Sequence, residues 1–133
     1  MAISSENAKF QAFNDNPKYE YGWHSSDSNE TKFIGIKLAS PKISNFITFT
    51  SYGSGWWKIS PIEFRIEGSN NGNSFISLST QSTSFYHKHQ KRTFNFDNNQ
   101  PFLLYRIVCL KNSDMTNDGN WSSLKHLNFG YMK

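Results

Sequence analysis

Residues 52–75 read YGSGWWKISPIEFRIEGSNNGNSF, and the second half of this stretch predicts the fold. The run IEFRIE at 62–67 alternates apolar and charged residues with a period of two, which is typical of a strand with one face toward a core. Pro61 stands at the first strand position, where its missing N–H costs least. Asn71-Gly72 follows the run, and because both residues tolerate positive φ, the pair predicts a hairpin turn and a second strand.

The composition of the whole chain favours strands as well. At 133 residues the chain is long enough for one domain with its own core. Aromatic residues make up 17% of it, Ala is scarce, and Ser, Asn and Thr are abundant, which favours strands joined by polar turns over helices. We therefore expect a flexible lead-in at residues 1–9 and a single all-β domain at residues 10–133.

Further strands are expected on both sides of the opening stretch. The predicted ranges are 9–13, 32–38, 45–51, 74–79, 92–97, 102–110 and 122–131. The range 102–110, FLLYRIVCL, is the most continuously apolar, so we expect a central strand buried on both faces, with Cys109 as a small buried hydrophobe. Short strands at this spacing, without a convincing helix, predict an antiparallel sandwich of about eight strands.

Several classes of protein find no support in the sequence. The N-terminus MAISSENAKF lacks the features of a signal peptide, and no run approaches the roughly 20 apolar residues that span a bilayer. The chain has no GxSxG element and no carboxylates at a catalytic spacing, and His87 and His89 lack a third ligand at metal spacing. We therefore expect neither an enzyme nor a membrane-spanning protein.

The net charge of +4 is concentrated in HKHQKR at residues 87–92. This run suits a solvated connection between strands, and it also suits an acidic partner such as a phosphate or an acidic sugar. A nucleic-acid patch is a third reading, but no RNA- or DNA-binding signature accompanies the run. We therefore expect no nucleic-acid partner.

The residues of the opening stretch resemble a known family. IEFRIEGSNNGNSFISL, at 62–78, is similar to the signature of discoidin-like domains, also called F5/8 type C domains or family 32 carbohydrate-binding modules. In that family a strand ends in a Gly/Ser-Asn-Asp-Gly turn, here Gly68–Gly72, which is followed by an aromatic residue, here Phe75. Further agreement comes, in chain order, from Ala12-Phe13, Trp23, FIGIKLASPKISNF at 33–46, LLYRIVCL at 103–110 and LKHLNFG at 124–130.

The resemblance covers about residues 10–131. It implies an eight-stranded antiparallel jelly-roll β-sandwich with a galactose-binding-domain-like fold, whose ligands bind at the loops of one end. Many carbohydrate-binding members hold calcium through an Asp after "AF" and a Glu in the final strand. Here Asn14 and Asp15 follow Phe13, and Lys125 and His126 occupy the region of the Glu. A hard cation needs several oxygen ligands including carboxylates, so we expect no cofactor, with Asn14 and Asp15 as the remaining calcium candidates.

The first candidate ligand residues are Trp56, Trp57 and Lys58. Adjacent residues of an extended chain point to opposite sides, so we expect one Trp to pack inward and the other to project. The resemblance implies that the projecting indole stacks on the C–H face of a sugar while Lys58 supplies a charged donor. Two alternatives stay open, namely that both Trp side chains close the end of the core, or that they form a membrane-inserting loop tip.

The other candidates lie in two further loops. Tyr21 and His24 belong to the first long loop, and neutral imidazole can donate and accept at once, which suits a pair of sugar hydroxyls. Asn120 and Trp121 precede the last strand and complete a shallow platform in this reading. The alternatives are a solvated histidine in the first loop and a polar turn with a buried Trp in the second.

The function that the resemblance implies is non-catalytic, lectin-like binding of cell-surface glycans, as in phage tail-fibre or bacterial adhesin modules. Such a module serves cell adhesion or host attachment at a virion or cell surface, as a homo-oligomer or as part of a larger multidomain protein. One alternative is a cytosolic protein–protein adaptor. A second is an anionic membrane or phosphate binder that uses Trp56 and Trp57 with the basic run at 87–92.

Overall fold

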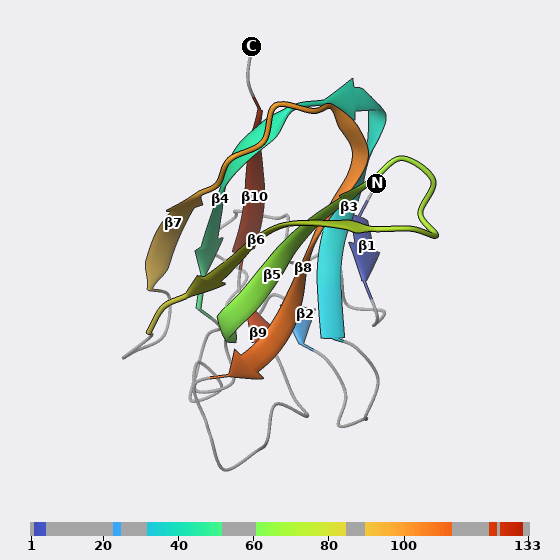
Figure 1. Cartoon of the computed structure of the whole chain (residues 1–133). Coiled ribbons are helices and arrows are strands. Elements are labelled where there is room, and N and C mark those ends of the chain that lie inside the picture. The colour runs from blue at the N-terminus through green and yellow to red at the C-terminus, as the bar shows by residue number, and fades with distance from the viewer. Residues whose placement is uncertain are drawn as a thin grey trace.

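The computed structural model describes residues 2–4, 23–24, 32–51, 61–84, 90–112, 123–124 and 126–131, which are strands and the segments next to them (Figure 1). The strands are β1 (Ala2–Ser4), β2 (Trp23–His24), β3 (Lys32–Lys42), β4 (Ser44–Thr50), β5 (Pro61–Ser69), β6 (Ile76–Ser82), β7 (Lys91–Asn95), β8 (Phe102–Asn112), β9 (Ser123–Leu124) and β10 (His126–Tyr131). No helix occurs among these residues, and hence none that could cross a membrane.

The strands form two main antiparallel sheets and one small one. The larger sheet has the order β1-β3-β8-β5-β6, the second has the order β10-β4-β7, and β2 pairs with β9. The two main sheets face each other across the core (Figure 1). The predicted all-β antiparallel jelly-roll sandwich is therefore confirmed.

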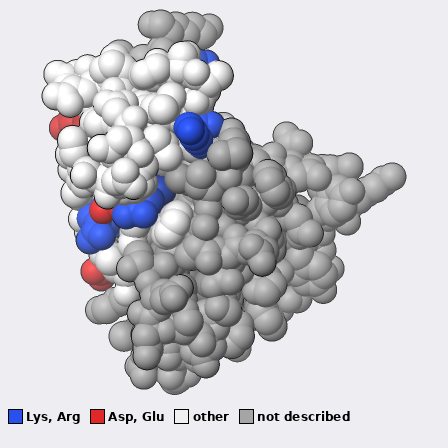
Figure 2. Space-filling view, turned by 90° about the vertical axis from the view of Figure 1, so that its right-hand side faces the viewer, with Lys and Arg blue, Asp and Glu red and all other residues white. Residues whose placement is uncertain are grey.

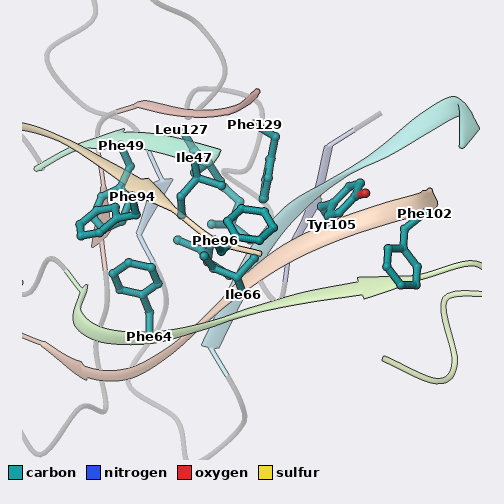
Figure 3. Packing of buried hydrophobic residues seen from close by; sticks show 12 residues of the cluster. Ile47, Phe49, Phe64, Ile66, Phe94, Phe96, Phe102, Tyr105, Leu127 and Phe129 are labelled. Carbon is teal, nitrogen blue, oxygen red and sulfur yellow. The ribbon is translucent and has the colours of Figure 1, made fainter. Parts of the chain in front are cut away.

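The core consists of apolar side chains that both main sheets direct inward (Figure 3). Its aromatic centre is a triangle of Phe49 from β4, Phe64 from β5 and Phe94 from β7, whose ring centroids lie 4.9–5.2 Å apart. Two of the three contacts are edge-to-face, which is a favourable geometry for aromatic pairs. The abundant Phe residues thus hold the two sheets together.

Strand β8 is the central strand of the larger sheet, as predicted, and it pairs with β3 on one side and β5 on the other. Tyr105 and Ile107 are buried in the core, while Leu104 and Val108 are buried on the opposite face of the sheet. The prediction for Cys109 was wrong in one respect, because its side chain is only half-buried.

The turn after β5 is longer than the predicted hairpin and spans residues 70–75. The Ser69 hydroxyl accepts hydrogen bonds from the backbone N–H groups of Asn71 (3.2 Å) and Gly72 (3.0 Å). The Asn71 side-chain oxygen accepts a further bond from the N–H of Ser74 at 2.9 Å. Gly72 has φ of 77°, a conformation that costs glycine little. Side chains therefore hold this turn together.

The charged face of β5 is partly buried. Glu67 is only 5% exposed, and its carboxylate accepts hydrogen bonds from Arg65 Nε (2.6 Å) and Arg106 Nε (2.7 Å). The Arg106 guanidinium lies over the ring of Phe75 at 3.6 Å and over that of Phe33 at 4.7 Å. Phe75, the aromatic residue after the turn, therefore holds an arginine that neutralises a buried carboxylate.

Some predicted boundaries differ from the structure or lie outside its described residues. Three residues of the predicted lead-in 1–9 form β1 and pair with β3, while the domain boundary at residue 10 stays a prediction. The predicted strand 9–13 lies outside the described residues. The final predicted strand, 122–131, is described as two strands, β9 and β10.

Candidate functional site

The described strands bring the ends of several long connections to one end of the sandwich. The segment 52–60, which contains Trp56 to Lys58, joins β4 to β5. Pro61, where this segment ends, pairs with Asn112, where the segment 113–122 begins. The two segments with most of the candidate residues are therefore attached at paired positions of neighbouring strands.

A second pairing joins the first long connection to the last one. In β2 and β9, Trp23 pairs with Leu124 and His24 pairs with Ser123. Opposite Cα atoms in an antiparallel pair lie about 4.5–5.5 Å apart. His24 is therefore held one strand spacing from Ser123, which lies two positions after Trp121 in the sequence.

The start of the segment 52–60 is fixed by Ser51, whose side chain is fully buried. The backbone N–H of Ser51 donates to the carbonyl of Gln90 at 2.9 Å, and the N–H of Gln90 donates to the Ser51 hydroxyl at 2.8 Å. Two residues further on, Arg92 donates from Nη2 to the carbonyl of Ser84 at 3.3 Å. The described part of the basic run 87–92 thus helps to hold together the segments at this end of the sandwich.

The opposite end of the sandwich is closed by a buried hydrogen-bond network around Tyr105. The Tyr105 hydroxyl donates to the carbonyl of Lys42 at 2.6 Å. It accepts from the backbone N–H of Ser44 at 3.0 Å and from Asn98 Nδ2 at 3.2 Å. These described polar groups satisfy one another, so this end serves stability, and the end where Pro61 pairs with Asn112 is the better candidate for ligand binding.

Tyr131 packs beside this network. Burial, together with the charge of the nearby Tyr105, raises the pKa of Tyr131 to about 12. The ammonium of Lys42 lies 5.5 Å from the centre of its ring. Tyr131 is therefore held in its neutral form, as expected of a structural residue.

Most of the predicted site residues lie outside the described residues. These are Tyr21, Trp56, Trp57, Lys58, Asn120 and Trp121, together with the calcium candidates Asn14 and Asp15. His24 is described through its backbone pairing in β2. Among the described residues, no three His, Cys, Asp or Glu side chains cluster as metal ligands do. The roles of the predicted residues stay predictions.

Sequence reasoning passed over one exposed aromatic residue, Phe46 of β4, whose exposed fraction is 36%. The signal for it lies in the alternation of FITFT at 46–50, where Phe46 falls in phase with Thr48 and Thr50 and out of phase with the buried Ile47 and Phe49. An aromatic residue in the polar phase of a strand is directed away from the core.

Comparison with known families identifies the chain. The model of the F5/8 type C domain matches residues 2–127, nearly the full length. The chain belongs to the F5/8 type C domain family. The resemblance read from the sequence over about residues 10–131 is therefore confirmed. Comparison with curated protein sequences finds no match.

Solved structures similar to this F5/8 type C domain include three modules from Clostridium perfringens. CBM32-3 of a family 31 glycoside hydrolase has a TM-score of 0.74 and 20% identity, with 100% of this chain and 88% of that chain covered. The family 32 CBM of NanJ, in complex with galactose, has a TM-score of 0.69 and 18% identity, with coverage of 97% and 90%. CpGH89CBM32-5, in complex with GalNAc-β-1,3-galactose, has a TM-score of 0.70 and 17% identity, with coverage of 97% and 93%.

Proposed function

We propose that this F5/8 type C domain is a non-catalytic module that binds carbohydrate through the loops at the end where Pro61 pairs with Asn112. The observation that supports this site is the pairing of the strand ends. The β5–β8 and β2–β9 pairs join the attachment points of the segments that contain His24, Trp56, Trp57 and Asn120, whereas the Tyr105 network closes the other end.

The proposed mechanism is stacking combined with hydrogen bonding. One of Trp56 and Trp57 stacks on the apolar face of a sugar, and Lys58 donates to a hydroxyl. His24 donates and accepts at a pair of hydroxyls, and Asn120 supplies a carboxamide. Tyr21 and Trp121 extend the platform at its two sides.

The ligands of similar structures support a glycan as the partner. Galactose is bound in the NanJ module and GalNAc-β-1,3-galactose in CpGH89CBM32-5. A further similar structure, with a TM-score of 0.69 and 15% identity, is a chitosan-binding module from a Paenibacillus chitosanase/glucanase. We place galactose-type sugars first among the candidate ligands of this domain.

On the described part of the face seen in Figure 2, one group of Lys and Arg side chains lies beside Asp and Glu side chains and another lies apart from them, within a surface that is mostly uncharged. A broad basic region, which binding to an anionic membrane would favour, is not present on the described part of that face.

The proposed biological role is attachment to surface glycans, as part of a larger protein or an oligomer such as a tail fibre or adhesin. A shallow sugar site binds weakly, and linking several copies raises the apparent affinity by mass action within the assembly. The proposed location is therefore outside the cell, on a virion or a cell surface.

A glycan array probed with a multimerised domain tests this function. We expect the wild type to bind a related set of galactose-containing glycans, and the Trp56→Ala/Trp57→Ala double variant to bind them markedly more weakly while staying folded, because it lacks the loop site. Ile76→Ala is a matched control, because this side chain is 54% exposed at the start of β6, next to the 70–75 turn and away from the loop end. It should bind like the wild type.

Two results would contradict the proposal. If no glycan is bound by the wild type, the domain is not a lectin-like module, and a protein partner becomes the better candidate. If the folded double variant binds as the wild type does, the site is not formed by these tryptophans.

A further inference from the structure

The outer face of the three-stranded sheet presents a regular grid of side chains around Phe46. In the first row, Phe46 of β4 lies between Gly130 of β10 and Asn95 of β7. In the second row, Thr48 lies between Asn128 and Thr93. The rows are two residues apart along β4, so their side chains lie on the same face of the sheet.

The ring of Phe46 lies flat on the neighbouring strand. A Cβ atom added to Gly130 would meet Phe46 Cζ at 1.9 Å and the two Cε atoms at 2.2 and 2.3 Å. Because the Cε atoms are almost as close as Cζ, this Cβ would meet the face of the ring and not its edge. One face of the ring therefore covers the backbone of Gly130, and the 36% of Phe46 that is exposed belongs to the opposite face and the edges of the ring.

Polar side chains surround this open ring face. Asn95 and Asn128 are both exposed, and within the part of the chain that the structure describes neither carboxamide makes a hydrogen bond. The hydroxyls of Thr48 and Thr93 lie 3.2 Å apart and form a hydrogen bond with each other. An aromatic face between two exposed carboxamides offers stacking together with donors and acceptors, with the exposed Thr93 beside them, whereas Thr48 is only 9% exposed.

From this arrangement we propose that the Phe46 face, defined as Phe46, Thr48, Thr93, Asn95 and Asn128, is a second binding surface for a neutral sugar. The sugar stacks with its C–H side on the open ring face, and its hydroxyls bond to the carboxamides of Asn95 and Asn128. The two residues lie two strand spacings apart across the sheet, about 10 Å, and two residues apart along it, about 7 Å. Their Cα atoms are therefore about 12 Å apart, which is wide enough for one pyranose ring between them.

The distribution of ionisable residues around the Phe46 face favours a neutral ligand. The two rows of the Phe46 face contain no ionisable residue. Ionisable residues begin in the next row, where Lys91 and His126 pair with Thr50. Within the two rows, an acidic sugar or a phosphate has no cation to pair with, so the cost of removing its charge from water is not compensated. A neutral sugar carries no charge and does not have this cost.

The Phe46 face is separate from the proposed loop site. Phe46 lies four residues, or about 13 Å, from Thr50, after which β4 leads to Ser51 and the loop end. The proposal rests on described residues alone and stands or falls independently of the loop site. If both are correct, one glycan chain or two can engage two surfaces of the same domain.

The alternative role of Phe46 is purely structural, namely to cover the backbone of Gly130. A substitution can distinguish this role from sugar binding. Leucine at position 46 still packs on the glycine backbone but has no ring face, whereas tyrosine keeps the ring. The test uses the ¹⁵N-labelled full chain, titrated with galactose, with neutral galactan and with xylan. The signals to follow are the backbone amide of Gly130 and the side-chain amides of Asn95 and Asn128.

We expect at least one of these probes to shift all three sets of signals in the wild type and in Phe46→Tyr. In folded Phe46→Leu, binding at this face should be about tenfold weaker, which is the size expected for a lost aromatic contact. The shifts should persist in Trp56→Ala/Trp57→Ala, which removes the proposed loop site only.

Three results would overturn the proposal. They are shifts confined to the loop end, no shifts with any of the three probes, and equal affinity in Phe46→Leu. Shifts at the loop end alone would leave the proposed function standing and remove the Phe46 face. Shifts at the Phe46 face alone would support the Phe46 face and contradict sugar binding at the loop site. If Phe46→Leu fails to fold, the wild-type titration still decides between these outcomes.

Discussion

Replacement of Tyr105 by phenylalanine should destabilise the domain without creating a cavity, because only the buried hydroxyl is removed. In the wild type this hydroxyl donates to the carbonyl of Lys42 and accepts from the N–H of Ser44 and from Asn98 Nδ2. Asn98 Nδ2 keeps other acceptors in the variant, namely the carbonyls of Ser44 and Gln100. The N–H of Ser44, whose residue is fully buried, loses this acceptor.

The magnitude follows from these contacts. A neutral hydrogen bond contributes about 1 kcal/mol, and leaving a buried donor without a partner costs about 1–3 kcal/mol. We therefore expect Tyr105→Phe to lower the free energy of unfolding by about 2–4 kcal/mol. Urea denaturation measures it, as a lower midpoint with an unchanged slope.

Thr93→Val is the control for this experiment. It also removes a hydroxyl, but this hydroxyl has one hydrogen bond and not three, and it belongs to an exposed residue, although its partner Thr48 is only 9% exposed. Its cost should stay below about 1 kcal/mol. If Tyr105→Phe costs no more than Thr93→Val, the network does not close this end of the sandwich. Glycan binding at the proposed loop site should be unchanged in Tyr105→Phe, because that site lies at the opposite end of the sandwich.

Three further predictions concern single positions. The pKa of Tyr131 is about 12 in the folded protein and 10.0 ordinarily, so the contribution of this group to stability should be complete below pH 10 and lost between pH 10 and 12. In Tyr131→Phe, the denaturation midpoint should therefore fall less than in the wild type between pH 10 and 12. Glu67→Gln should cost about 1–3 kcal/mol in thermal or urea unfolding, because two guanidinium groups lose their carboxylate, and a neutral result would show that the cluster is not stabilising. Gly72→Ala should cost about 1–2 kcal/mol because φ is 77°, whereas Asn73→Ala in the same turn keeps its backbone bond to Asn71 and should cost less than 1 kcal/mol.

The sequence predicted the strands well where the alternation of residue types was local. The run at 62–67 became β5, and the continuous apolar run at 102–110 became the central strand β8. The burial of Glu67 was not predictable in this way. It depends on Arg106, which lies 39 residues later and meets Glu67 only through the pairing of β5 with β8.

The candidate site was predictable only in part. Family resemblance pointed to one end of the sandwich, and the β2–β9 and β5–β8 pairs place the described ends of its segments on neighbouring strands, while the site itself stays a prediction. The orientation of Trp56 and Trp57 does not follow from a period, because alternation holds only for extended backbone. Phe46 was missed for another reason. The position of its ring depends on Gly130, whose lack of a side chain lets the ring lie on the backbone, and Gly130 is far from Phe46 in the sequence.

The central position of β8 has a consequence for how the protein is made. Strands β3 and β5 are close in sequence but have no pairing with each other, because β8 lies between them and supplies partners such as Ile107 to Ile34 and Ile66. The larger sheet therefore cannot close until the ribosome has released residues 102–112. Until then one edge of β3 and one edge of β5 have no partner strand. Folding should therefore be slow for the chain's size, and the chain should be most prone to aggregation late in synthesis.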